Sequence, residues 1–229
     1  MSDPIPTLIY SDADLLVVDK PAGVLSIPDG YDRAVPYMGK LLEPSYGRLW
    51  VVHRLDKNTS GVMVLARNAD AHRILSNQFS GHQVSKTYHA IISGDPDWDE
   101  KFLDLPLRSN VGRRNRTTVD IGDGKPARTL FRVLERFSGY ALLAAHPETG
   151  RTHQIRAHLY DLGYSILSDE LYGHGQISPF FNRMALHARA LTFWHPTTGV
   201  MITFEAPYPS DFELGIAQLR FLDATEQED

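Results

Sequence analysis

Cysteine is missing from all 229 residues, which excludes disulfide bonds, a thiolate nucleophile and a cysteine-based zinc site. The longest apolar runs fall far short of a membrane span, and residues 1–7 are polar and proline-rich rather than basic and then apolar. These absences predict a protein with no signal peptide and no membrane contact. A cysteine-free chain fits a reducing compartment, and we expect a cytoplasmic protein.

Several catalytic motifs are also missing. The sequence has no GxxxxGK[ST] or GxGxxG phosphate loop and no GxSxG nucleophile elbow. Its ten histidines include no HExxH pair, and His153 and His158, five residues apart, would lie on different faces of a helix. The sequence therefore offers neither a nucleotide-phosphate loop nor a paired-histidine metal motif. A metal-dependent hydrolase built on the histidines remains an alternative, which tight and stoichiometric zinc or manganese binding would support.

Positive charge is scarce overall but concentrated in one region. The net charge is −5, yet residues 51–160 carry 16 basic against 11 acidic side chains, compared with 4 against 7 before them and 3 against 10 after them. This basic block is compatible with a phosphate-binding face, although the segments would also neutralise each other in a fold. Arg113 and Arg114 belong to an arginine-rich stretch, residues 108–116, expected to form an exposed hairpin or loop.

Short apolar runs bounded by turn residues predict three hairpins, over residues 8–19, 129–145 and 185–204. Apolar spacing predicts helices over residues 35–42, ending before Pro44, and 70–79, with Asp70 near the start of the second. A third begins with Thr149 or Thr152 as its cap, and a last one spans residues 210–221 before a frayed acidic tail at 223–229. Many hairpins and few helices indicate an α+β fold with a mixed, mostly antiparallel sheet in one domain, residues 1–229.

The run at residues 53–61 (HRLDKNTSG) stands between two apolar segments, residues 49–52 and 62–66, which read as buried strands. His53, Arg54 and Asp56 thus fall on a loop held by two core strands, with a glycine that suits a sharp turn. A plain hydrogen-bonded turn is the simpler interpretation. Arg156, one turn inside the third helix, requires a carboxylate partner. Such a pair keeps an aspartate ionised, as a carboxylate nucleophile requires.

The loop motif, HRLD followed by TSG, resembles the catalytic motif of the RluA family of RNA pseudouridine synthases. The run KTY at residues 86–88 resembles the second family motif, and GRTHQIR at residues 150–156 resembles the third. Further family signatures are present, and all of the motifs stand in the expected order along the chain: KPAG at residues 20–23, GKPA at 124–127 and LHA at 186–188. The resemblance covers residues 8–206 and leaves no room for an S4-type domain, as in the compact form of the family.

The resemblance implies that Asp56 is the nucleophile, that Tyr88 lies against the target base and that Arg156 pairs with Asp56 and holds it charged. Arg54 would enter the space left by the flipped uridine, because neither C1′ nor C5 of a stacked uridine is open to a side chain. His53, Arg151, Arg113 and Arg114 would be further RNA contacts.

The implied activity is the isomerisation of specific uridines in structured RNA, in stem-loops of tRNA, of large-subunit rRNA or of both. It needs no cofactor and no obligatory protein partner, and we expect a monomer. The implied architecture is a bifurcated sheet with flanking helices and an active-site cleft across it, forming a single catalytic domain. The alternative is a non-catalytic RNA-binding protein on the same scaffold, which predicts damage to Asp56, Tyr88 or Arg156, and all three are present.

Overall fold

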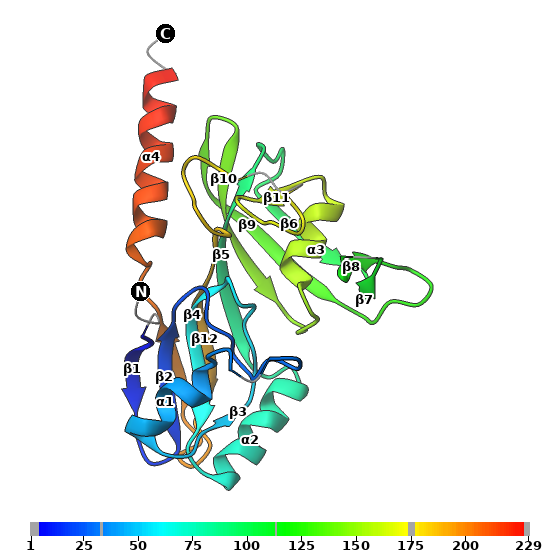
Figure 1. Cartoon of the computed structure of the whole chain (residues 1–229). Coiled ribbons are helices and arrows are strands. Elements are labelled where there is room, and N and C mark those ends of the chain that lie inside the picture. The colour runs from blue at the N-terminus through cyan, green and yellow to red at the C-terminus, as the bar shows by residue number, and fades with distance from the viewer. Residues whose placement is uncertain (1–4, 33, 113, 174–176, 227–229) are drawn as a thin grey trace. The chain divides into compact units, whose positions relative to one another are not determined.

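The computed structural model describes residues 5–32, 34–112, 114–173 and 177–226. The chain forms two compact units (Figure 1). The first consists of Met1–Lys86 and His187–Pro207, and the second of Thr87–Leu186 and Tyr208–Asp229. Each unit is therefore assembled from two separate stretches of chain, and each is described by itself below.

The first unit combines short strands with two helices. Its helices are α1 (Met38–Tyr46) and α2 (Ala69–Ser80), which flank the strands in Figure 1. Its strands are β1 (Thr7–Ser11), β2 (Leu15–Lys20), β3 (Trp50–Val51), β4 (Ser60–Ala66), β12 (Leu186–Trp194, entering this unit at His187) and β13 (Met201–Glu205).

Strand β4 is the centre of this unit, and all seven of its residues are buried. On one edge it pairs antiparallel with β2. On its other edge, Ser60 and Gly61 pair with β12 in parallel, whereas Leu65 and Ala66 pair with β3 antiparallel. One edge of β4 thus serves two different strands, so the sheet is bifurcated at this point, as predicted.

The second unit is antiparallel throughout its described strand pairs. Its main sheet has the order β5-β10-β9-β6, with β11 also on β5, while β7 and β8 form a separate hairpin. The elements are β5 (Ser85–Ser93, entering this unit at Thr87), β6 (Glu100–Asp104), β7 (Leu107–Val111), β8 (Arg116–Val119), β9 (Arg128–Phe137), β10 (Tyr140–Pro147), α3 (Gln154–Asp161), β11 (Ser165–Ile166) and α4 (Ser210–Glu226).

The three predicted hairpins are confirmed, and so is the inward face of the last helix, where Phe212, Ile216 and Leu219 are buried. This helix continues to Glu226, beyond the predicted end at residue 221 and into the predicted tail, whose last three residues lie outside the described part. Among the described residues, no helix has the length and apolar character that crossing a membrane demands.

Several predicted helix boundaries are wrong. Helix α1 runs past Pro44 instead of ending before it; the proline has no N–H to donate to the carbonyl one turn earlier, and the helix ends two residues later. Helix α2, by contrast, lies within one residue of its predicted bounds, with Asp70 in its first turn as expected, and its cap is Asn68, whose Oδ1 accepts the N–H of Ala71 at 2.8 Å. Helix α3 begins after His153, which has left-handed backbone angles and provides no side-chain cap.

Candidate active site

The loop between β3 and β4 holds Asp56 between two anchored neighbours. The Leu55 N–H donates to the Ser26 hydroxyl oxygen at 3.0 Å, and the same hydroxyl donates to the Leu55 carbonyl at 2.8 Å. On the other side, the Lys57 carbonyl accepts the N–H of Gly23 at 2.8 Å. The backbone on both sides of the half-buried Asp56 is therefore fixed by a preceding segment of the chain.

Lys20 adds a buried charge to this anchor. Its side chain is fully buried, and its Nζ donates to the carbonyls of Pro21 at 2.9 Å, Val24 at 2.8 Å and Lys57 at 3.1 Å. A buried ammonium is costly unless its donors are satisfied. These bonds satisfy the donors of Lys20 and connect residues 20–24 to the loop of Asp56. The KPAG run therefore has a structural role in supporting this loop.

The end of the loop is joined to β12. The Ser60 hydroxyl lies 2.9 Å from Nδ1 of the fully buried His187. Gly61 has φ +116°, and a Cβ there would lie 2.2 Å from the carbonyl oxygen of Ala188. The glycine was expected to serve a sharp turn, but it lies within β4 and permits the close approach of β12.

Thr59 differs from its neighbours. Its side chain is 2% exposed, and among the residues that the structure describes its hydroxyl has no hydrogen-bond partner. Its backbone N–H donates to the Asp56 carbonyl at 3.1 Å, which closes a turn over the candidate nucleophile. An unpaired buried hydroxyl costs about 1–3 kcal/mol.

His53 is part of the scaffold of the loop. Its ring stacks on Phe79 with centroids 4.5 Å apart, and its Nε2 accepts the N–H of Val64 at 3.1 Å. Burial, together with the positive charge of Lys86, lowers the pKa of His53 to about 3, so the ring is neutral at pH 7. Burial also lowers the pKa of Lys86 to about 8. Arg54, by contrast, is exposed. RNA contacts of His53 and Arg54 stay predictions.

The second unit carries the other candidate residues. Tyr88 is half-buried on β5, opposite Ala145 of β10, and packs against the core of this unit. Arg156 lies on α3 with 9% exposure, and its Nε and Nη2 donate to the two carboxylate oxygens of Asp169 at 2.7 and 2.8 Å. Asp169 is thus a carboxylate partner of Arg156, and sequence reasoning did not identify it. Asp56 belongs to the other unit, and its pairing with Arg156 stays a prediction.

Much of the basic block is neutralised within the second unit. Besides Arg156, four arginines of this block pair with acids at 2.5–2.9 Å: Arg108 with Asp120, Arg128 with Glu148, Arg132 with Glu100, and Arg136 with Asp99. Arg114 is exposed near the tip of the predicted hairpin, now β7–β8, while Arg113 lies outside the described residues. Arg151 is half-buried, and its Nε donates to the Pro126 carbonyl at 2.9 Å, within the GKPA run. The candidate RNA contacts are therefore a small subset of the arginines.

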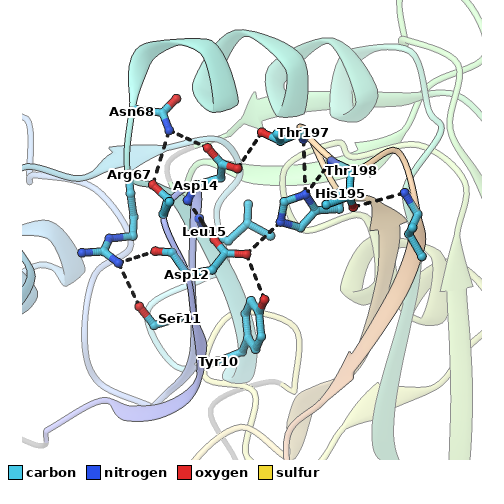
Figure 2. Close-up of polar contacts among 12 residues, drawn as sticks. Tyr10, Ser11, Asp12, Asp14, Leu15, Arg67, Asn68, His195, Thr197 and Thr198 are labelled. Atoms are coloured by element: carbon cyan, nitrogen blue, oxygen red, sulfur yellow. Dashed lines mark hydrogen bonds and ion pairs between the residues drawn. The ribbon is translucent and has the colours of Figure 1, made fainter.

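Within the described ranges, one group of side chains has the spacing of a metal site. Ligand atoms of Asp12, Asp14 and His195 lie within 4.8 Å of one another in the first unit. However, Nδ1 of His195 accepts the N–H groups of Thr197 and Thr198 at 3.2 and 3.1 Å, so Nε2 carries the proton and donates to Asp12 at 2.8 Å (Figure 2). Both ring nitrogens are thus engaged.

The carboxylates of this cluster are engaged as well. Asp14 accepts the Thr197 hydroxyl at 2.6 Å and the Asn68 side-chain amide at 2.7 Å, as Figure 2 shows. The network links the β1–β2 turn, the start of α2 and the β12–β13 turn. A cation would have to displace these bonds, so the geometry favours a structural role over the metal-dependent alternative.

Comparison with known proteins gives these residues a context. The sequence model of the family described as RNA pseudouridylate synthase matches residues 14–161. The chain belongs to this family. The RluA resemblance is thereby confirmed, and the synthase isomerises uridine in RNA. The matched range includes the loop of Asp56 as well as Tyr88 and Arg156.

Curated relatives resemble the synthase over most of its length. It is 36% identical to the dual-specificity RNA pseudouridine synthase RluA of Escherichia coli K12, over 90% of this chain and 94% of the relative. It is 37% identical to the ribosomal large subunit pseudouridine synthase D of Zymomonas mobilis, over 90% of this chain and 70% of the relative.

Solved structures agree with the predicted fold of the synthase. Human RNA pseudouridylate synthase domain containing 4 has a TM-score of 0.77 at 26% identity, covering 93% of both chains. Human RNA pseudouridylate synthase domain containing 1 also scores 0.77, at 28% identity, over 98% of this chain and 89% of the other. The α+β assignment is thereby confirmed.

Proposed function

We propose that Asp56 is the nucleophile with which the synthase isomerises a flipped-out uridine. The observation that carries the proposal is the anchoring of both its neighbours, Leu55 by Ser26 and Lys57 by Gly23 and Lys20. A nucleophile is effective when it is held in place before the substrate arrives, because the cost of ordering it is already met. The loop provides this order around a carboxylate that remains half-exposed.

In the proposed reaction the Asp56 carboxylate attacks C1′ of the ribose, or captures the sugar through an intermediate in which the glycosidic bond is broken. The bond from C1′ to N1 breaks as the Asp56 oxygen bonds C1′, and the freed uracil turns. C5 then bonds C1′ while the bond from C1′ to Asp56 breaks, so the carboxylate is regenerated. The proton on C5 is lost and N1 is left protonated, so no oxidant, reductant or cofactor is consumed. Tyr88 lies against the base, Arg156 pairs with Asp56, and Arg54 occupies the space vacated by the base.

The proposed substrates are stem-loops of tRNA, of large-subunit rRNA or of both. The names of the relatives, a dual-specificity RNA synthase and a ribosomal large subunit synthase, support a structured RNA. We propose that the two units act together as one monomeric catalytic domain, because the family match spans residues of both. The cysteine-free sequence agrees with work in the cytoplasm.

The test is tritium release from tRNA and rRNA labelled at uracil C5, with a chelator present. Wild type should release tritium, and Asp56→Asn, which keeps the size of the side chain but not its nucleophilic oxygen pair, should release none. Asp70→Asn is the matched control, because this carboxylate is 90% exposed on α2. If a folded Asp56→Asn protein released tritium, Asp56 would be excluded as the nucleophile. RNA binding without release by wild type would support the non-catalytic alternative.

A further inference from the structure

The guanidinium of Arg156 is held in its own plane by one carboxylate. Asp169 receives both Nε and Nη2 of Arg156 in a two-point contact, and its side chain is fully buried. The same carboxylate also accepts the backbone N–H groups of Leu171 at 2.9 Å and Tyr172 at 3.0 Å. Because these N–H groups fix Asp169 itself, Arg156 is attached to a rigid acceptor and not to a mobile side chain.

An aromatic ring holds the guanidinium from a second direction. The Arg156 Cζ lies 4.9 Å from the ring centroid of Tyr172, which is 1% exposed. The Tyr172 hydroxyl accepts the N–H of Thr117 at 2.8 Å and donates to the Thr117 carbonyl at 3.0 Å. The ring is thereby fastened to β8, and a planar cation resting on it can neither tilt nor slide freely.

Stability alone is a poor explanation for this arrangement. A buried ion pair loses hydration that its attraction only about repays, and apolar residues of similar volume often stabilise a fold equally well. The unit also contains Arg183 and Asp211, a two-point pair of the same chemistry whose carboxylate is 39% exposed. The Arg156 pair, whose carboxylate is fully buried and whose guanidinium is fixed on two sides, therefore points to a requirement for orientation.

We propose that Asp169 is a positioning residue for the isomerisation. Asp169 sets the orientation in which Arg156 acts on the carboxylate of Asp56, the proposed nucleophile. Asp169 does not itself contact RNA. This inference rests on the proposed role of Arg156. It predicts that Asp169 influences the rate only through Arg156, since a displacement of about 1 Å at a catalytic group is enough to cost about 100-fold in rate.

The experiment is a double-mutant cycle on tritium release from C5-labelled RNA. Asp169→Asn keeps an acceptor for the two backbone N–H groups but replaces one acceptor of the guanidinium by a donor. We expect kcat to fall about 10- to 100-fold with KM for RNA within about 2-fold of wild type. In an Arg156→Lys background, which also has a lower kcat, adding Asp169→Asn should change kcat less than 2-fold.

The controls separate orientation from folding. Asp211→Asn, which breaks the Arg183 pair, should leave kcat unchanged. If Asp169→Asn does not fold, Asp169→Glu, which keeps the charge and shifts the guanidinium, replaces it in the cycle. Equal losses from the Asp169 variant in both backgrounds would overturn the positioning role while leaving Arg156 in the mechanism. Wild-type kcat in Arg156→Lys would overturn both this inference and the proposed role of Arg156, whereas the role of Asp56 would stand.

Discussion

The neutral state of His53 predicts a specific dependence of stability on pH. Its pKa is about 3 in the folded protein, against 6.5 for an unperturbed histidine. Below pH 6.5 the unfolded chain therefore takes up a proton that the folded chain rejects, so this group's contribution is fully present above pH 6.5 and is lost as the pH falls toward 3. Between pH 7 and pH 5, linkage gives a loss of about 2 kcal/mol from this one side chain.

The assay is urea unfolding at pH 7, 6 and 5, followed by tryptophan fluorescence, for wild type and His53→Gln. Burial also lowers the pKa values of His146 and His158, but both remain in the variant and cancel in the difference. Wild type should lose about 2 kcal/mol more than His53→Gln from pH 7 to pH 5. His82→Asn, at an exposed position with left-handed backbone angles, should retain the wild-type dependence.

Parallel losses in wild type and His53→Gln would refute this reasoning. An NMR titration of the His53 ring checks the same point without a variant, because a midpoint near pH 6.5 would show that the ring is freely protonated. In either case the loop of Asp56 would not depend on a neutral imidazole between Phe79 and the Val64 N–H.

Two further predictions concern the same loop. Thr59→Val should leave the free energy of unfolding unchanged or raise it by up to about 1 kcal/mol, because it removes an unpaired buried hydroxyl. Ser60→Ala should lower it by about 1–2 kcal/mol, because it removes the hydroxyl that contacts Nδ1 of the buried His187. Destabilisation by Thr59→Val in urea unfolding would show that the Thr59 hydroxyl is bonded. Lys20→Met should lower the free energy of unfolding by about 3 kcal/mol, because it removes the charged donor from several backbone carbonyls, and it should also reduce tritium release. A Lys20→Met variant with wild-type unfolding and wild-type release would mean that the loop of Asp56 needs no such anchor.

Local patterns in the sequence predicted the hairpins well, because alternating apolar strands and turn residues determine them over short distances. They also predicted the loop of Asp56 between two strands, although β3 is shorter than expected and half-buried. Helix starts were predicted less well. Thr149 looked like a cap, but its hydroxyl bonds Gln154 and the Arg128 N–H, and this competing use is visible only once β9 and α3 are adjacent.

The partners that order the candidate residues were largely beyond sequence reasoning. Ser26 lies 29 positions from Leu55, and Asp169 lies 13 positions from Arg156 in a stretch without periodicity. Lys20 gave a signal, since it ends a strand that is otherwise almost entirely apolar, but its acceptors are backbone carbonyls, which carry no sequence pattern. The family motifs identified the reacting groups, whereas their supports are set by tertiary contacts.

The divided chain of the first unit has a consequence for synthesis on the ribosome. The TSG end of the nucleophile loop is completed by His187 and Ala188, yet the 100 residues from Thr87 to Leu186 must be made first. At about 5–20 residues per second, these 100 residues alone take about 5–20 s to make, and β4 waits for β12 throughout. During this interval the start of one β4 edge, at Ser60 and Gly61, lacks its partner strand. The nascent segment is therefore a natural client for chaperones, and a pause in translation here would favour aggregation.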